Sequence, residues 1–248
     1  MSFLSGIVEF FSGNSIASSL VKIAGMAFVA KKIASSTNAS NNTAPIDQGV
    51  RQPIEPAADN KIPVVYGNAF KGGIITDAVM TNTNRTMYFC VTISEKTGTL
   101  LSTNADSAYT FKDIYWGQQR INFKEDGITA NHTTDSNGNI DRSLDGLVKI
   151  YCYAGDSTKQ VIPSPYVNNT SVNAYDIIPG WTSSTHMMNE LIFAVVRVDY
   201  NKDKNVTGLG NLIFNIDNSM KLPGDVLYDY MTNTRYGAGI SSTEVYSQ

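Results

Sequence analysis

The chain has 248 residues, enough for one large β domain or two smaller domains. Hydrophobic residues make up 42%, which suffices for a buried core, while charged residues reach only 17% and give way to uncharged Asn, Thr and Ser. A formal net charge of −3 and the lack of a long basic run argue against nucleic-acid binding. This composition is typical of a loop-rich β protein with a weakly charged surface.

Residues 1–36 read as a separate N-terminal helical arm, with two apolar stretches on either side of Gly13-Asn14. Lys22 interrupts a run that is already shorter than the roughly 20 apolar residues of a transmembrane helix. Glu9 replaces the positive start of a signal peptide. We expect the arm to pack on a partner or on the β domain, with interfacial membrane contact as the alternative. The expected contact residues are Phe3, Leu4, Ile7, Phe10, Phe11, Leu20 and Ile23.

Residues 37–61 form a polar linker, which Pro53 and Pro56 keep extended. A β-rich domain follows over residues 62–248, and the alternative is a division of this domain at an excursion over residues 155–185. The sequence therefore predicts a mainly β (β-rich α+β) fold, with antiparallel sheets or a barrel-like domain, long loops, the N-terminal arm and one short C-terminal helix.

The first half of the β domain contains several strand patterns. Residues 62–67 and 72–80 are predicted to form a hairpin through Gly72-Gly73. Residues 86–95 form a nearly continuous apolar run, which predicts a central strand buried on both faces. Residues 110–123 predict a second hairpin that turns at Gly117.

In the second half, residues 126–146 have the composition of an exposed loop, and residues 155–185 form a loop-like excursion that Trp181 is expected to anchor to the core. The remaining strands are predicted over residues 146–156, 186–201 and 205–218.

A short helix is predicted from Pro223, which suits the first helical turn, and Asp225 complements the helix dipole there. Gly237 and Gly239 end this segment. On these features alone, the helix closes a β domain at its surface. One apolar face is expected from Val226, Leu227, Tyr230 and Met231.

Signals for catalytic chemistry are weak. Cys90 and Cys152 lie in apolar strand patterns and are expected to be buried free thiols, with a disulfide as the alternative. His132 and His186 have no second ligand at metal spacing. Residues 135–141 superficially resemble a calcium loop, but Gly146 stands where the required glutamate belongs, so a solvated β-turn is favoured.

The scattered carboxylates leave a paired acid/base site as an alternative, because residues distant in sequence can meet in space. We predict no catalytic residues, no cofactor and no metal. The carboxylates concerned are Glu190, Asp199, Asp217 and Asp225.

The order of several segments resembles the N-terminal part of the phage tail tip attachment protein J family, the tail hub proteins. These segments are RQPIEP, IPVVYGNAFKGGIITDA, FCVTISE, IYWGQQRI, ELIFAVVRVDY and GDVLYDYMTNTRYGAGI, and together they cover about residues 49–240. The positions that correspond to family motifs are Tyr66-Gly67, Gly72-Gly73-Ile74, Ser94-Glu95 and Tyr228 to Gly239, of which the last block is the most specific.

The resemblance implies an architectural role in the virion, at the distal end of the tail. It implies a homotrimer that contacts the distal tail protein, the tape measure protein and tail fibre or further hub components. Family members are commonly longer, so we expect either a short or split hub component or a smaller tail part that reuses the N-terminal hub domain, and receptor binding stays open. The suspected interface and signature residues are Asp229, Tyr230, Asn233, Arg235, Tyr236, Gly237 and Gly239.

We therefore predict a non-enzymatic component of a phage tail tip or baseplate. The main alternative is a receptor- or carbohydrate-binding module, for which Trp116 and Trp181 are the candidate platforms. A hydrolase acting on cell wall is a third class and would require clustered carboxylates.

Overall fold

The structure is a computed structural model that describes residues 61–168 and 170–245. The chain divides into two compact units, residues 1–48 and 49–248, and all described residues belong to the second. The predicted arm over residues 1–36, its contact residues and the linker up to residue 60 lie outside the described residues.

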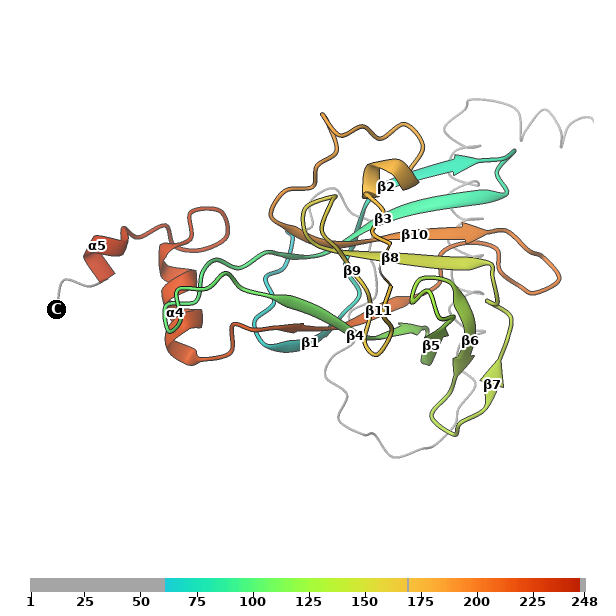
Figure 1. Ribbon diagram of the computed structural model, residues 1–248, viewed down its shortest axis with the longest axis horizontal. Helices are drawn as coiled ribbons and strands as arrows, with labels where there is room; N and C mark the ends of the chain where they lie inside the picture. Colours follow the sequence, from blue (N-terminus) through green and yellow to red (C-terminus); the bar gives the residue numbers. More distant parts are fainter. Residues whose placement is uncertain (1–60, 169, 246–248) are drawn as a thin grey trace, which may run out of the picture. The chain divides into compact units, whose positions relative to one another are not determined.

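Two antiparallel sheets face each other across a common core (Figure 1), which confirms the predicted mainly β fold. The six-stranded sheet has the order β1-β11-β4-β5-β6-β7, and the five-stranded sheet has the order β2-β3-β10-β8-β9. The first sheet consists of β1 (Asn68–Lys71), β11 (Leu212–Asn218), β4 (Tyr109–Trp116), β5 (Gln119–Phe123), β6 (Ala130–Thr134) and β7 (Ile140–Asp141). The second consists of β2 (Ile74–Thr81), β3 (Thr86–Glu95), β10 (Leu191–Asp199), β8 (Val148–Gly155) and β9 (Gln160–Val161).

The central strands β3 and β10 are buried on both faces, as their apolar runs predict. In β10, Ile192, Ala194 and Val196 face the core between the sheets, while Phe193 and Val195 face the other side. A strand without a solvated face needs apolar residues at consecutive positions, and this explains the unbroken apolar run from Leu191 to Val196 in β10.

The later part of the excursion, from Ala174 to Trp181, covers the outer face of the five-stranded sheet and forms a second, smaller core there. This part contains the short helix α3 (Ala174–Ile177). The earlier part of the excursion contains β9, and Val161 and Tyr166 pack against the core between the sheets. Trp181 is buried in this second core, and its Nε1 donates a hydrogen bond of 2.6 Å to Asp77 Oδ2 on β2. Trp181 therefore anchors the excursion, as predicted.

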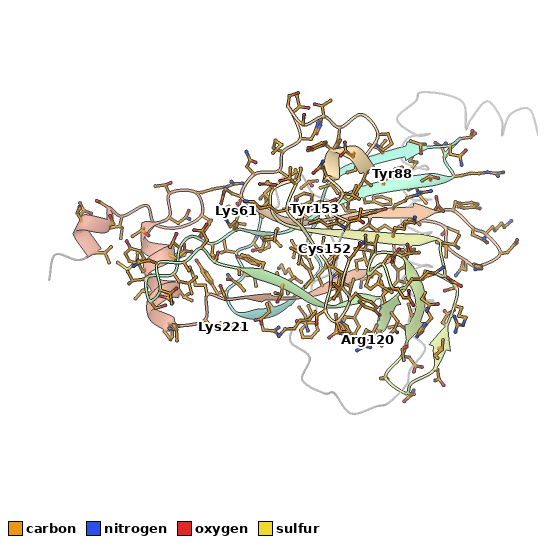
Figure 2. All side chains as sticks on the ribbon, viewed as in Figure 1. Lys61, Tyr88, Arg120, Cys152, Tyr153 and Lys221 are labelled. Carbon is orange, nitrogen blue, oxygen red and sulfur yellow. The ribbon has the colours of Figure 1, made fainter. Side chains whose placement is uncertain are left out.

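The two cysteines lie on opposite faces of the five-stranded sheet. Cys152 packs in the core between the sheets, whereas Cys90 packs under the excursion. Figure 2 labels Cys152 and Tyr153, neighbours on β8 that belong to the two different cores. Both thiols are free and buried, which confirms the prediction, and burial raises the pKa of Cys90 to about 12.

The predicted strand over residues 62–67 and its predicted hairpin with residues 72–80 are both wrong. Residues 62–67 contain only an isolated bridge between Val64 and Glu95, and no hairpin joins them to β2. Instead β1 and β2 belong to different sheets, and Gly72-Gly73 forms the connection from one sheet to the other. Gly73 has a positive φ of 80°, and a Cβ there would lie 2.8 Å from the Thr92 carbonyl oxygen.

The predicted loop over residues 126–146 contains the β6–β7 hairpin. The polar strand β6 (ANHTT) carries no apolar alternation, and β7 has only two residues, Ile140 and Asp141, so neither strand is marked by a pattern. Asp135 accepts hydrogen bonds from the N–H groups of Asn137 and Asn139, both of 2.8 Å, and so closes the turn. The calcium-like segment over residues 135–141 is thus a β-turn, which is the favoured interpretation.

The predicted hairpin at Gly117 is also present, between β4 and β5.

The C-terminal helix α4 spans Pro223–Thr232, with Pro223 in its first turn as predicted. It lies at one end of the described body, and the β2–β3 turn lies at the opposite end (Figure 1). A short helix, α5 (Ser242–Val245), follows it.

Candidate functional site

Helix α4 turns its charged side toward the body and its apolar side toward solvent. Its only charged residues, Asp225 and Asp229, are its buried residues, whereas Leu227 and Tyr230 are more than half exposed. The predicted apolar face is therefore wrong as a packing face. An ordinary surface helix has the opposite arrangement.

Asp225 and Asp229 are four residues apart, so both side chains project from the same side of the helix. We call the contacts that they and the following segment make the α4 junction. It comprises Asp225, Asp229, Arg235 and Tyr236 on the helix side, and Tyr66, Glu95, Gly98 and Ser102 on the body side.

Asp225 binds the loop that follows β3. Its Oδ1 accepts a hydrogen bond of 2.9 Å from the Ser102 N–H, and its Oδ2 accepts one of 2.7 Å from the Ser102 hydroxyl. The carboxylate also lies in the first helical turn, where the helix dipole favours a negative charge. One residue thus stabilises the start of α4 and attaches it to the body.

Asp229 is the centre of the α4 junction. Its Oδ2 accepts hydrogen bonds of 2.7 Å from the hydroxyls of both Tyr66 and Tyr236, and its Oδ1 accepts one of 2.9 Å from the Gly98 N–H. A Cβ at Gly98 would lie 2.8 Å from Asp229 Oδ1, so the approach requires glycine. Burial and then Asp229 raise the pKa of both tyrosines, and both phenols stay neutral donors.

Arg235 forms an ion pair with Glu95 at the edge of the junction. The Arg235 Nε lies 2.9 Å from Glu95 Oε2, and the arginine side chain is about half exposed while the glutamate is buried. Burial raises the pKa of Glu95, and the charge of Arg235 opposes that rise. The arginine therefore compensates a buried carboxylate at the end of β3.

The segment after α4 folds back on the helix. Asn233 Oδ1 accepts a hydrogen bond of 2.8 Å from the Arg235 N–H, and the Ala238 N–H donates one of 2.8 Å to the Tyr230 carbonyl. A Cβ at Gly237 would lie 2.1 Å from that carbonyl oxygen, and Gly239 has a positive φ of 67°. Both glycines are thus required by the backbone itself.

A buried polar network lies next to the junction and joins the ends of β4, β11 and β3. Asn218 Nδ2 donates hydrogen bonds of 2.8 Å to the Val65 carbonyl and of 2.9 Å to the Thr97 hydroxyl. The Tyr109 hydroxyl accepts a hydrogen bond of 3.1 Å from the Thr97 N–H. Because these groups satisfy one another, they hold residues 65–66 and 95–98 in place for α4.

The structure brings four of the suspected signature residues, Asp229, Asn233, Arg235 and Tyr236, into one connected set of contacts with the body. Tyr230 lies outside this set and faces solvent. The sequence alone does not indicate Tyr66 and Glu95 as partners of this segment, and it marks Asp225 only as a residue that the helix dipole favours. The available signal was the spacing of two carboxylates at i and i+4 in an otherwise uncharged helix.

The carboxylates of the α4 junction are engaged in hydrogen bonds within the chain, and Asp229 alone accepts three. Of the other carboxylates considered for a pair, Asp199 accepts a hydrogen bond from Thr86, and Asp217 pairs with Lys112 and Lys221. Glu190 lies near enough to Glu95 for its negative charge to add to the rise that burial causes in the pKa of Glu95. Figure 2 shows Lys221 where β11 leads into α4. Within residues 61–168 and 170–245, no three His, Cys, Asp or Glu residues are grouped to hold a metal ion.

Neither tryptophan is displayed as a flat exposed platform. The Trp181 ring is stacked on His186 at 4.9 Å between ring centroids and is largely buried. Trp116 packs against the core between the sheets, and a Cβ at Gly210 would lie 2.2 Å from its ring.

No protein-family model matches the sequence, and no curated protein matches it. In the described part of the chain, no helix is long and apolar enough to cross a membrane.

Proposed function

We propose that the chain is a structural, non-enzymatic component of a phage tail tip or baseplate, of the tail hub type. The observation that carries this proposal is the convergence, at the α4 junction, of segments that separately resemble the hub family. Tyr66 of the first strand motif binds Asp229 of the C-terminal block, 163 positions away. Glu95 of the ISE motif pairs with Arg235 of the same C-terminal block.

Two further contacts join segments that resemble the family. The Val65 N–H donates a hydrogen bond of 3.0 Å to the Ser94 hydroxyl, and Gly73 approaches the Thr92 backbone. Short motifs that match by chance have no reason to touch one another. Their contact supports the interpretation that they were retained together as one structural unit.

In this proposal the chain belongs to the virion and links the tail tube, the tape measure protein and the host-attachment elements. Its proposed partners are the distal tail protein, the tape measure protein, tail fibre or further hub components, and two further copies in a homotrimer. The sparse charge, at 17% of residues, suits a surface that neighbouring subunits cover.

The receptor- or carbohydrate-binding alternative receives no specific support from the described residues, because both indoles are used in packing. Loss of glycan binding by a Trp181→Ala variant would favour it. We propose no catalytic role for the chain.

Cross-linking mass spectrometry on purified virions of the phage that encodes the chain tests the proposal. We expect cross-links from this chain to the tape measure and distal tail proteins, in particles that carry tails. Absence of the chain from tailed particles, or cross-links to capsid proteins alone, would contradict the proposal.

A further inference from the structure

The outward side of α4 is apolar and carries no charge. Leu222 is 57% exposed, Leu227 59% and Tyr230 54%, and Met231 is half-buried beside them. We call these four residues the outer face of α4. Clustered exposed apolar side chains of this kind mark interaction surfaces in soluble proteins.

Gly224 extends the outer face toward the start of the helix. It lies three positions before Leu227, which in turn lies three before Tyr230 and four before Met231, so these residues share one side of the helix. A Cβ at Gly224 would meet no atom within 4 Å, and the backbone there does not have a positive φ. Within the described residues nothing requires glycine at this position, although glycine weakens a helix relative to alanine. Glycine at position 224 would be required if the backbone of a neighbouring molecule packed closely against the helix there.

We propose that the outer face of α4 is a contact between copies of this chain, in which α4 packs against the same face of α4 in a second copy. The absence of charge supports a second copy as the occupant. Asp225 and Asp229 are buried and hydrogen-bonded in the junction, so two outer faces meet without repulsion between like charges. A strongly charged partner finds no opposite charge on the helix to pair with.

This contact rests on the homotrimer of the proposed function and names the surface through which its copies meet. Self-association is measured on the purified full-length chain, whereas the tail location is measured on virions. A chain that self-associates through α4 but is absent from tails would overturn only the function, and a chain that is present in tails and keeps its association in the α4 variants would overturn only the contact.

Sedimentation velocity over a range of concentrations provides the first test. We expect Leu227→Asp to raise the dissociation constant between copies at least about tenfold, because a buried leucine contributes at least that much to an interface. The matched control is Met80→Asp, because Met80 is 57% exposed and lies near the β2–β3 turn, far from α4. This control should leave association unchanged.

Gly224→Ala separates the contact from folding. Since a Cβ fits there without a clash inside the chain, we expect an unchanged or higher melting temperature together with weaker association. Weaker folding of Leu227→Asp cannot imitate this result. Unchanged association in Gly224→Ala and in Leu227→Asp would overturn the proposal.

Oxidative cross-linking gives the geometric test. Two outer faces in contact bring Leu227→Cys of each copy close together, while the native thiols are buried. We expect Leu227→Cys to form covalent dimers on mild oxidation much faster than Met80→Cys. Equal rates for the two variants, or a monomeric wild-type chain at every concentration, would overturn the proposal.

Discussion

The core between the two sheets consists of apolar side chains from long strands, whereas the α4 junction consists of two buried carboxylates, two tyrosines and backbone N–H groups. Apolar packing is non-directional and tolerates exchanges of similar volume. Hydrogen bonds to a buried carboxylate fix distance and direction, and loss of one partner leaves a buried polar group unsatisfied. Substitutions at the α4 junction should therefore be tolerated less well than apolar exchanges of similar volume in the core.

The largest expected effect belongs to the core. Phe214→Ala removes a fully buried ring from β11 and should lower the free energy of unfolding of the whole body by about 3–5 kcal/mol. Urea unfolding followed by far-UV circular dichroism measures this change. Val167→Ala, at a position that is 78% exposed, should change it little, and equal losses would contradict the assignment of the core.

The next effect belongs to the junction and should be local. Asp229→Ala leaves the Tyr66 and Tyr236 hydroxyls and the Gly98 N–H without their acceptor, at a cost of about 2–4 kcal/mol. We expect faster hydrogen exchange in α4 and residues 233–240, while β3 and β10 stay protected. Asp203→Ala, at an exposed position, is the control. Uniform loss of protection across both sheets would show that the two regions do not open separately.

High pH should weaken the junction through its tyrosines. Their pKa is raised in the folded chain, so their contribution to stability is complete below the unfolded value of about 10 and is lost as the pH rises above it. Each raised tyrosine then steepens the decline by up to about 1.4 kcal/mol per pH unit. Urea midpoints from about pH 9 to about pH 11 should fall less steeply for Tyr236→Phe than for the wild type. Identical slopes would argue against the Tyr236–Asp229 hydrogen bond.

The smallest effect is expected at the rim of the junction. Arg235→Gln removes the charge beside Glu95, and because the arginine is half exposed the cost should be only about 0.5–1 kcal/mol at neutral pH. Since burial raises the pKa of Glu95 and a protonated Glu95 needs no cation, the loss should shrink as the pH falls toward 4. Lys202→Gln is the exposed control. A loss that is independent of pH would contradict the role given to this ion pair.

The sequence predicts the long buried strands and the position of α4 well, because apolar runs, Pro223 and the glycines act locally. It does not predict that β1 and β2 join different sheets, since strand partners depend on contacts far along the chain. The β6–β7 hairpin escapes prediction because the polar strand β6 lacks an apolar alternation and β7 has only two residues.

The orientation of α4 could not be predicted from the helix alone. Counting apolar residues places Leu227 and Tyr230 inward, but the N–H groups of Gly98 and Ser102, more than 120 positions away, draw the carboxylates inward instead. Likewise, the resemblance picked out Tyr66 and Arg235 as motif members without indicating that each meets another motif. Hydrogen-bond partners of this kind become visible only once the sheets are assembled.

The placement of the two cysteines makes the chain its own reporter of how it unfolds. An alkylating reagent reaches Cys90 only when the Trp181 excursion lifts from the sheet, and it reaches Cys152 only when the two sheets separate. Mass spectrometry of peptides labelled over time therefore records two distinct openings in one experiment, without any substitution. The order in which the two labels appear shows whether the excursion detaches before or after the two sheets separate.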